Sequence, residues 1–415
     1  MKLKTLTNSE FDEFSSNHPL GNYLQSSNYA ELASKEGYEY DLLGLLDDDN
    51  NIQAASLILN KKIGLFNRYG YAPKGFLLNY YDTDIITEFT NKLKNYYSKK
   101  NLIFIKINPE ISIGEMDYKN QSISYNKNQM IDGILKGFNF RKFENNKRFE
   151  SKLPHYNAIQ VLKNTNLNTI SKNTRNKIKK SIKNGLTIKK GTRDDIEILY
   201  NFIKNKKNHP INHYYNYYDA FNDSVDLFLV EINFDDCLIN LREKYEQEFE
   251  NNKSITEKLK VAPSKSLQTK KAVSDKALET YRDNIAEATK HLAVNKKAYI
   301  AGALTIRYKN RVYIIISGFD QRYRNFCPNY YLHYQLIEYY KKDYDYLDLN
   351  GITGDFTTNN PYKGLDQFKL GFNPLTFEYI GEYDFIINEN VYQSMIQSGQ
   401  LAKEFNRKIK SINEN

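Results

Sequence analysis

Residues 276–292, KALETYRDNIAEATKHL, interrupt a chain that otherwise alternates strand and helix patterns. Apolar side chains recur in this stretch at steps of three and four residues: Leu278, Tyr281, Ile285, Ala288 and Leu292. That spacing places them along one face of a helix. A second charge-rich stretch, LREKYEQEFENNKS at 241–254, precedes it, and VAPSKS at 261–266 separates the two. The pattern predicts an antiparallel coiled-coil helical hairpin over residues 236–293.

The sequence on either side of this hairpin reads as one α/β plan used twice. Before residue 150, the strands YDLLGLL (40–46) and IQAASLILN (52–60) precede a helix at 85–97 and the strand LIFIKINPE (102–110). After residue 155, the strands YIAGALTIRY (299–308) and RVYIIISGF (311–319) precede a helix at 328–342 and the strand YDYLDLNG (344–351). Mixed strands and helices in this order predict two α/β domains, each with a mixed sheet.

Charge and targeting signals narrow the class of protein. The 415 residues carry a formal net charge of +9, which suits anionic partners. The N-terminus lacks the apolar core of a signal peptide, and no run of eighteen apolar residues occurs, so we expect a cytoplasmic protein with peripheral membrane contact at most. Cys237 and Cys327 lie ninety residues apart, which disfavours a disulfide framework or a zinc ribbon.

Motifs for common cofactors are missing from the sequence. It contains no P-loop, no GxGxxG and no glycine-rich acetyl-CoA loop at a helix start. His209 and His213 are spaced like a pair of metal ligands, but Pro210 makes a regular helix start there doubtful and no carboxylate completes a ligand set nearby. We therefore expect neither ATP, acetyl-CoA nor a metal as a cofactor.

The stretch SKNTRNKIKKSIKNG, residues 171–185, predicts a basic helix that ends at Gly185. Ile178 and Ile182 lie four residues apart and are expected to dock the helix on the core. Cations surround the rest of the helix: Arg175, Lys177, Lys179, Lys180 and Lys183. Such a surface suits a phosphate backbone, and a merely solvated basic face is the alternative interpretation.

Several motifs taken in order resemble the Fem-type aminoacyl-tRNA-dependent peptidyltransferases, which build the interpeptide bridge of peptidoglycan. The motifs are GNYLQSSNYAEL (21–32), YAPKGFLLNY (71–80), KINPE (106–110), TRNKIKKSIKNGL (174–186), LNGITGDF (349–356), GLDQFKLGFNP (364–374) and EYIGEYD (378–384). The resemblance implies two acetyltransferase-like domains, with a helical arm interrupting the second. It places the first domain at 1–150 with 381–415 returning to it, and the second at 151–235 and 294–380.

The same resemblance implies a reaction and its partners. An amino acid is transferred from a charged tRNA, the co-substrate, to an amine on the stem peptide of a peptidoglycan precursor. The acceptor is a lipid-linked or UDP-linked muramyl pentapeptide, so the protein is expected in the cytoplasm or at the inner face of the membrane. An activated ester and an amine held in attack geometry react downhill without ATP, provided that the developing oxyanion is stabilised.

Three segments match family positions with assigned roles. Phe368 and Lys369 match a Phe-Lys pair whose lysine meets the tRNA terminus, and Glu382 matches an acidic position; the resemblance makes these three the catalytic candidates. Tyr217 matches a tyrosine that contacts the precursor's phosphates. Phe368 and Phe372 can anchor their segment while Lys369 points into a cleft.

Other positions depart from the family pattern and are candidates for substrate binding. His213 and Lys74 stand where the family has arginines, and Asn108 stands where it has an aspartate. A family lysine falls on Ala33, with Lys35 the nearest cation, and a family tyrosine falls on Ile316. A neutral histidine supplies one donor where arginine supplies a fork, so the grip on a diphosphate is expected to weaken.

These departures leave two alternatives open. In the first, the protein is a catalytically impaired member that binds tRNA or precursor, or pairs with itself or with another Fem-type protein. In the second, it is a related tRNA-dependent transferase whose acceptor is an amine outside the cell wall.

Overall fold

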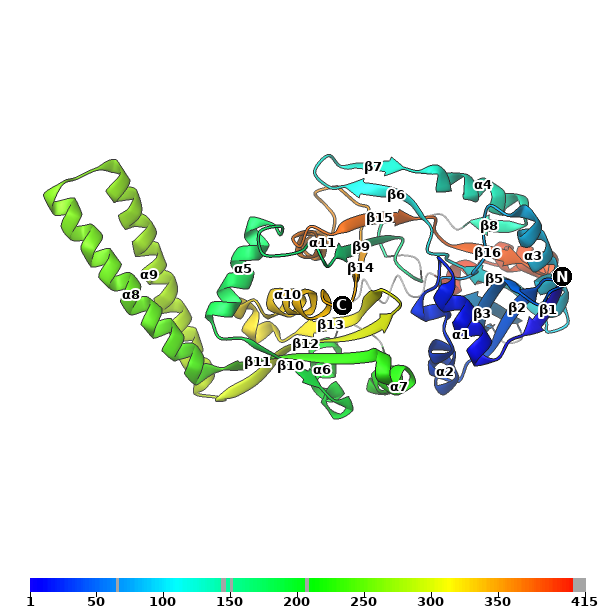
Figure 1. The fold of residues 1–415 in the computed structure, drawn as a ribbon, viewed down its shortest axis with the longest axis horizontal. Coiled ribbons are helices and arrows are strands. Elements are labelled where there is room, and N and C mark those ends of the chain that lie inside the picture. Colours follow the sequence, from blue (N-terminus) through cyan, green and yellow to red (C-terminus); the bar gives the residue numbers. More distant parts are fainter. Residues whose placement is uncertain (65–66, 143–146, 150–151, 206–208, 406–415) are drawn as a thin grey trace.

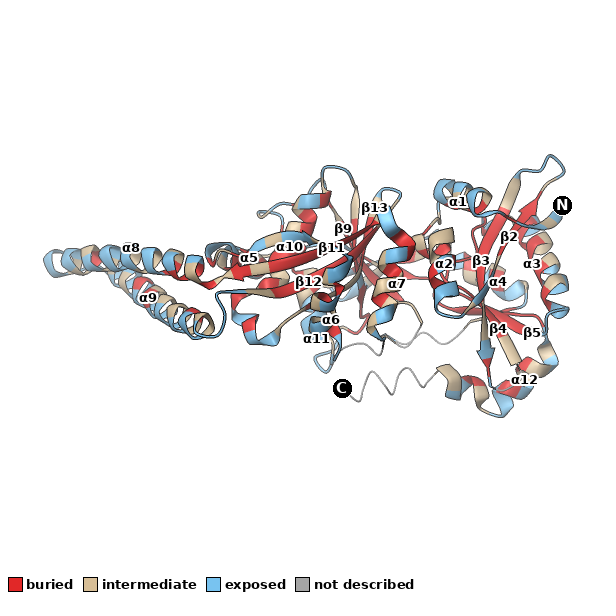
Figure 2. Cartoon of the chain, turned by 90° about the horizontal axis from the view of Figure 1, so that it is seen from below, coloured by how far each residue is buried: buried red, intermediate tan, exposed pale blue. Residues whose placement is uncertain are grey.

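The computed structural model describes residues 1–64, 67–142, 147–149, 152–205 and 209–405. Figure 1 shows two sheet-containing bodies side by side and a pair of long helices that extends away from one of them. The strands are largely buried, whereas the outer part of the helical pair is exposed (Figure 2). The chain is thus a mixed α/β protein with two mixed sheets and a projecting helical hairpin.

The first sheet has seven strands in the order β1-β2-β3-β4-β5-β16-β8. The pair β4 and β5 is parallel and the other pairs are antiparallel. Helix α3 connects β4 to β5, as a parallel pair requires. The strands are β1 (Lys2–Thr5), β2 (Glu39–Leu46), β3 (Ile52–Ile63), β4 (Asn67–Ala72), β5 (Leu102–Ile107), β8 (Phe140–Lys142) and β16 (Tyr383–Ile386).

The second sheet has nine strands in the order β10-β11-β12-β13-β14-β9-β15-β6-β7. Its parallel pair is β13 and β14, joined through helix α10, so each sheet contains one β-α-β unit. The strands are β6 (Ser112–Asp117), β7 (Ser122–Tyr125), β9 (Tyr156–Val161), β10 (Thr187–Gly191), β11 (Val225–Asn233), β12 (Lys297–Tyr308), β13 (Arg311–Phe319), β14 (Tyr346–Ile352) and β15 (Leu375–Tyr379).

The division of the chain at residue 150 does not match the sheets. Strands β6 and β7 lie within residues 1–150 but belong to the second sheet, because β6 pairs with β15. After residue 381 the chain adds β16 between β5 and β8 of the first sheet. Residues 150–151, where the two domains were expected to meet, and the last ten residues of the expected return, 406–415, lie outside the described residues.

Helices cover the faces of both sheets. Those of the first half, together with the last helix, are α1 (Asn8–Asn17), α2 (Ser27–Lys35), α3 (Thr83–Ser98), α4 (Met130–Gly137) and α12 (Glu389–Gln397). Those around the second sheet are α5 (Lys172–Lys183), α6 (Ile196–Ile203), α7 (Ile211–Phe221), α10 (Pro328–Tyr340) and α11 (Lys363–Leu370). None of the helices described is long and apolar enough to cross a membrane.

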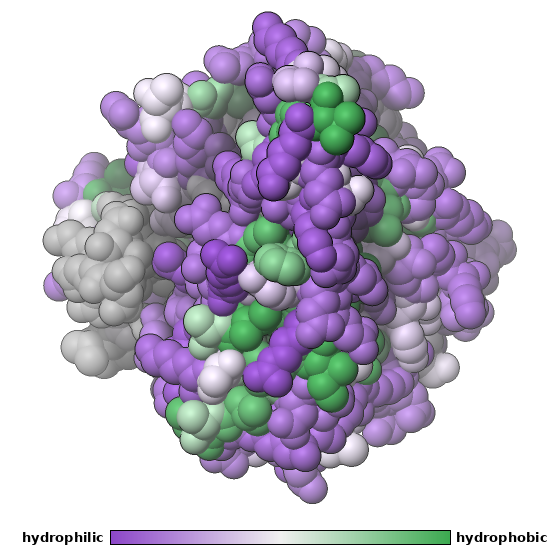
Figure 3. All heavy atoms as spheres, turned by 90° about the vertical axis from the view of Figure 1, so that its left-hand side faces the viewer, coloured by the Kyte–Doolittle hydropathy of each residue, from purple (hydrophilic) through white to green (hydrophobic). Residues whose placement is uncertain are grey.

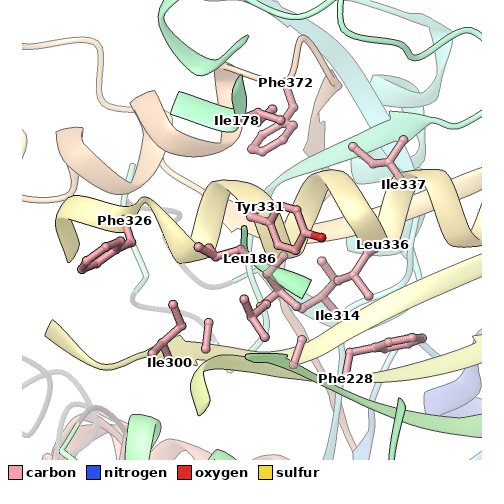
Figure 4. Packing of buried hydrophobic residues seen from close by; sticks show 14 of the residues in the cluster. Ile178, Leu186, Phe228, Ile300, Ile314, Phe326, Tyr331, Leu336, Ile337 and Phe372 are labelled. Carbon is pink, nitrogen blue, oxygen red and sulfur yellow. The ribbon is translucent and has the colours of Figure 1, made fainter. Parts of the chain in front are cut away.

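Helix α10 is the centre of the second core. Figure 4 shows Ile178 and Phe372 packed on one side of it, and Ile300, Ile314 and Phe228 of the sheet on the other. All five side chains belong to one buried cluster. Burial of this kind stabilises a fold by roughly 25 cal/mol for each Å² of apolar surface removed from water. The basic helix α5 is therefore held on the outside of α10 by a small apolar contact.

The docking face of α5 differs from the predicted one. Ile178 is fully buried, but Ile182 is 46% exposed. Thr174 and Ser181 are buried instead. A Cβ atom placed on Gly371 would lie 2.1 Å from Oγ1 of Thr174, so the chain after α11 approaches α5 closely at this point. The contact face is rotated toward Thr174 because a glycine meets it there.

The hairpin consists of α8 (Phe234–Val261) and α9 (Lys265–Leu292), slightly longer than the predicted 236–293 arm because α8 begins at Phe234. Phe234, Leu238 and Leu241 at its base belong to the second core, and Ile255 and Leu278 are buried farther out. Seen from the side on which the arm projects, the surface is mainly hydrophilic with small hydrophobic groups (Figure 3). The antiparallel hairpin is present, and its coiled-coil twist stays a prediction.

Candidate active site

A polar pocket lies where the two sheets meet, and we call it the inter-sheet pocket. Residues of the first half reach it from the segment around the short 3₁₀ helix Tyr23–Gln25 and from the segments that follow β4 and β5. The second sheet contributes side chains of β9, β13 and β14. Its lining comprises Asn22, Tyr23, Leu24, Lys74, Glu110, Leu153, Pro154, Asn157, Tyr313, Ile314, Asp348 and Asn350.

An ion pair between Glu110 and Arg311 joins the two halves at this pocket. Nζ of Lys74 lies 3.9 Å from the same carboxylate, and Asn22 donates to it at 2.5 Å. Burial alone would raise the pKa of Glu110, but attraction to Arg311 and Lys74 outweighs it and holds the pKa below its ordinary value. Glu110 therefore remains charged at neutral pH and fixes both cations.

Asp348 forms the opposite wall on β14. Its two oxygens each accept from Nδ2 of Asn157 at 2.9 Å, and Oδ1 also accepts the backbone N–H of Asn350 at 2.7 Å. The nearest cation, Nη1 of Arg311, is 4.0 Å from Oδ2. Burial is the largest influence and raises the pKa of Asp348 above its ordinary value. The pocket thus holds two carboxylates with opposite pKa shifts.

Lys74 and Asn108 lie together beside the pocket. The Asn108 side-chain oxygen accepts the backbone N–H of Lys74 at 2.9 Å and so supports a residue with a φ of 56°. Nζ of Lys74 sits 4.4 Å from the centre of the Tyr379 ring. Burial lowers the pKa of Lys74. Lys74 therefore lines the pocket, and Asn108 positions it.

Lys369 is buried on α11, with 8% of its surface exposed. Its Nζ donates to the backbone oxygen of Gly351 on β14 at 2.5 Å. Gly351 directly follows Asn350, which lines the inter-sheet pocket. Phe368, half-buried, meets the rings of Tyr330 and His333 edge-on at 4.9 and 4.8 Å. The predicted anchoring of this segment by aromatic rings is present, and Lys369 contacts the rim of the pocket without lining it.

The basic helix α5 packs next to this segment in the folded protein. Lys177 donates to the hydroxyl of Tyr330 at 2.8 Å, and Tyr330 in turn contacts Phe368. The backbone N–H of Ser171 donates to Gly371 at 3.0 Å. Lys179 and Lys183 are exposed, and Arg175 and Lys180 are half-buried. We use the name donor surface for Arg175, Lys179, Lys180 and Lys183 together with Tyr330 and Phe368.

Glu382 lies away from both regions. It forms an ion pair with Lys106 at 2.8 Å and accepts the backbone N–H of Lys152 at 3.1 Å. Asp384 pairs with Lys106 at the same distance. Burial would lower the pKa of Lys106, but the two carboxylates raise it above its ordinary value. The geometry gives Glu382 a partner inside the first domain and does not bring it to the pocket.

The residues expected to contact a diphosphate lie on α2 and α7. Tyr217 is buried and its ring stacks on Phe221 at 5.9 Å. Phe221 meets Tyr23, a residue of the pocket lining, at 5.9 Å. His213 forms a hydrogen bond with Glu36, and Lys35 pairs with Glu31 at 2.9 Å. Tyr217 also interacts directly with Tyr23 through a side-chain hydrogen bond, so it adjoins the pocket lining, whereas His213 and Lys35 face carboxylates of this chain.

The remaining sequence signals have clear places in the fold. Pro210 is the N-cap of α7, so the doubtful helix start is a helix start. The rings of His209 and His213 stack at 4.1 Å, and no group of three metal-binding side chains occurs among the residues that the structure describes. Ala33 is buried on α2 and Ile316 is half-buried on β13.

Sequence reasoning missed most of the pocket. Glu110 belongs to the KINPE motif, but that motif pointed to Asn108 two residues earlier. Arg311, Asp348 and Asn157 lie in strands and belong to no recognised motif, and only Asp348 could have been noticed, as a carboxylate between two leucines in LDL. The three meet only through strand pairing, because Tyr313 is opposite Asp348 and β14 pairs with β9.

Known proteins of the same architecture were found over nearly the whole chain. Aminoacyltransferase FemA of Staphylococcus epidermidis is 25% identical over 407 residues, which cover 94% of this chain and 97% of that protein. FemA of Staphylococcus aureus is 25% identical over 409 residues with the same coverage. The crystal structure of FemX has the same fold, with a TM-score of 0.73 and 21% identity over 95% of this chain and all of that one.

The relatives that match 94% of this chain define its class, the aminoacyltransferases. A model of the FemAB family matches residues 6–397. The chain belongs to the FemAB family.

Proposed function

We propose that this protein transfers an amino acid from a charged tRNA to an amine on the stem peptide of a peptidoglycan precursor, and so takes part in building the interpeptide bridge. The match to the FemAB family over residues 6–397 supports the class of reaction. The observation that carries the assignment of the two substrates is the end of β14. There Asp348 and Asn350 line the inter-sheet pocket while the next residue, Gly351, bonds Lys369 of the α11 segment.

In this proposal the donor surface binds the tRNA. Its cations suit the phosphate backbone of the acceptor stem, and the rings of Phe368 and Tyr330 offer a face for terminal bases. Lys369 is then a fixed positive charge close to the reacting ester, where an oxyanion develops. A lysine in that role neither gives up a proton nor attacks; it stabilises charge.

The acceptor amine enters the inter-sheet pocket, whose walls come from both halves of the chain. Lys74 lines this pocket and Arg311 adjoins it through Glu110, while Glu110 and Asp348 provide carboxylates that can attract an ammonium group. The precursor is lipid-linked or UDP-linked, and the work is done in the cytoplasm or at the inner membrane face. Ester aminolysis is downhill, so the proposal includes no ATP, acetyl-CoA or metal.

A second candidate function is a related transfer to an amine outside the cell wall. Two contacts favour it: His213 bonds Glu36, and Lys35 pairs with Glu31. Both positions were expected to hold the precursor's diphosphate, and both already have a carboxylate of this chain as a partner. A third candidate is a catalytically impaired protein that binds tRNA or precursor, alone or with a Fem-type partner. It is favoured by Asn108, whose side-chain oxygen accepts the backbone N–H of Lys74.

One assay separates the three. The protein is incubated with tRNA charged with labelled glycine, alanine or serine and with purified lipid-linked or UDP-linked precursor. We expect label in the stem peptide from at least one charged tRNA. Transfer only to another added amine would favour the second function. Intact tRNA binding without transfer to any acceptor would contradict the proposal and favour the impaired protein.

A further inference from the structure

Transfer to an amine needs a proton acceptor, because an ammonium nitrogen has no lone pair with which to attack an ester. Asn108 cannot take this role, since an amide does not hold a proton at neutral pH. Its side-chain oxygen is also occupied by the backbone N–H of Lys74 at 2.9 Å. If the chain itself supplies the acceptor, that group lies elsewhere.

Glu382 is poorly placed for the task. It does not line the inter-sheet pocket, and its carboxylate lies 2.8 Å from the buried Nζ of Lys106. Taking a proton would remove one of the two carboxylates that balance a cation with no exposed surface. A buried ion pair that loses one of its charges leaves the other charge without compensation, which is strongly destabilising. That cost opposes proton transfer to Glu382.

Of the described residues that line the pocket, Glu110 and Asp348 carry carboxylates. Glu110 is committed to the other half of the molecule by its ion pair with Arg311, and Lys74 and Asn22 also approach it. These contacts favour its charged form and depress its pKa. Glu110 is therefore a weak proton acceptor that holds the two halves together.

Asp348 has a different environment. Its hydrogen bonds come from the neutral amides of Asn157 and Asn350, which fill three of about four acceptor positions and leave one on Oδ2. Arg311 is 4.0 Å away, beyond a hydrogen bond. Other titratable groups face it from neighbouring segments: Tyr313 on β13, Tyr379 on β15, Tyr23 in the first half, Glu110 after β5 and Lys74 after β4.

These surroundings raise the basicity of Asp348. Burial and the nearby charge of Glu110 favour its protonated form, while Arg311 and the two asparagines oppose them, and the pKa ends above the ordinary value. A carboxylate with a raised pKa in a pocket accepts a proton more readily than one held by a cation. Geometry and basicity agree on the same residue.

We propose that Asp348 is the catalytic group that seats the acceptor ammonium in the inter-sheet pocket and takes its proton. This inference rests on the proposed function. The ammonium gives one proton to Asp348, and the neutral nitrogen forms the C–N bond to the ester carbon. The bond from that carbon to the ribose oxygen breaks, and the ribose oxygen takes the nitrogen's second proton. Asp348 finally releases its proton to water, so the products are an amide, a free ribose hydroxyl and H⁺.

The test is single-turnover transfer from charged tRNA to purified precursor between pH 6 and pH 9. With Asp348→Asn we expect the rate at pH 7 to fall by about 100-fold, within the range for losing a general base. Precursor binding at pH 7 should weaken, because the ammonium loses a charged partner, whereas tRNA binding should change less than threefold. The loss should shrink toward pH 9, where more of the amine is neutral without help. Asp345→Asn, a partly exposed carboxylate just before β14, is the matched control and should keep the wild-type rate.

A swap variant separates chemistry from folding. Asp348→Asn combined with Asn157→Asp keeps one amide facing one carboxylate but moves the charge from β14 to β9. We expect this protein to unfold at the wild-type temperature and to transfer at least tenfold more slowly at pH 7. The wild-type rate and pH profile in the swap would show that Asp348 is structural and would overturn the proposal.

The failure of this inference differs from the failure of the proposed function. No transfer by the wild-type protein with any charged tRNA would count against the function itself. Wild-type transfer with an undiminished rate in Asp348→Asn would overturn only the role of Asp348. A loss in Asp348→Asn that is equal at every pH would also overturn it, because a proton acceptor becomes dispensable as the amine deprotonates.

Discussion

Nζ of Lys369 on α11 lies 2.5 Å from the backbone oxygen of Gly351 on β14. This hydrogen bond ties the donor surface to the strand that forms one wall of the inter-sheet pocket. Because Lys369 is buried, its charge is poorly screened and acts strongly on nearby groups in a medium of low polarity. The two substrates of a transfer reaction can therefore meet at the end of one strand.

Replacing Lys369 by methionine should remove the positive charge at this meeting point while keeping the volume. We expect transfer to fall by about 100-fold or more, as when one positioned donor of an oxyanion site is removed. The Gly351 oxygen also loses its donor, which costs about 1 kcal/mol of stability. Labelled transfer and urea unfolding measure the two effects. Lys363→Met, an exposed lysine on the same helix, is the control, and equal losses in both variants would remove Lys369 from the mechanism.

Gly371 explains part of the FKLGFNP motif by packing. A Cβ there would lie 2.1 Å from Oγ1 of the buried Thr174, so Gly371→Ala should destabilise the protein by about 1 to 3 kcal/mol. Gly364→Ala on α11 meets nothing within 4 Å and should be neutral or slightly stabilising, since alanine favours helix. Urea unfolding of both variants checks the prediction. Adding Thr174→Ala should recover part of the loss, and a neutral Gly371→Ala would contradict the close approach.

The ion pair of Glu110 with Arg311 should make the protein sensitive to acid. The pKa of Glu110 in the folded protein is below 4.5, so its contribution is complete above that pH and is lost as the pH falls through the lowered pKa. Glu110→Gln leaves two cations without their carboxylate, which we expect to cost roughly 3 kcal/mol at pH 7. Urea unfolding should show that the difference in unfolding free energy between Glu110→Gln and the wild type narrows below pH 4.5. Glu115→Gln, an exposed residue on β6, should show no such difference, and a gap that stays constant as the pH falls far below the ordinary pKa would refute the assignment.

Strong periodicity made much of the fold predictable from the sequence. The arm, β12, β13 and α10 each carry a long apolar pattern that a helix or strand requires, and they lie where that pattern placed them. Strands β6 and β15 have six and five residues and no clear alternation, so pairing within the sheet defines them: they pair with each other, and β6 also pairs with β7 and β15 with β9. Ile182 was assigned to the wrong face because the approach of Gly371 to Thr174 is invisible in the helix's own sequence.

The candidate site likewise contains some residues that the sequence singled out and others that it did not. Short motifs carry Lys74, Lys369 and the cations of α5, so the sequence could single them out as candidates, and their roles stay predictions. Asp348 and Arg311 were missed because no local motif marks them. They come together only through the pairing of β13 with β14, and Arg311 meets Glu110 of the first half only through the ion pair between them. Glu382 was selected by its motif, but the strand pairing of β16 with β5 places it beside Lys106.

The last prediction concerns how the binding of tRNA to the donor surface depends on salt concentration. Lys179 and Lys183 are exposed on α5, and if each neutralises a phosphate, tRNA binding releases one counterion for each lysine. The double variant Lys179→Ala, Lys183→Ala should weaken binding uniformly across tRNAs. The slope of log Kd against log salt concentration should become shallower by about one for each phosphate that is no longer neutralised. Titrations of labelled tRNA over a series of salt concentrations measure the slope.

The control for this prediction removes the same number of charges from another exposed cationic site. Lys265 and Lys270 are exposed near the start of α9, at the tip of the arm and far along the chain from α5. If the donor surface holds the tRNA, Lys265→Ala, Lys270→Ala leaves the slope unchanged, because net charge alone contributes little beyond a Debye length of about 8 Å in physiological salt. A slope change in the arm variant with none in the α5 variant would instead place the tRNA on the arm, and the basic face of α5 would then be only a solvated surface.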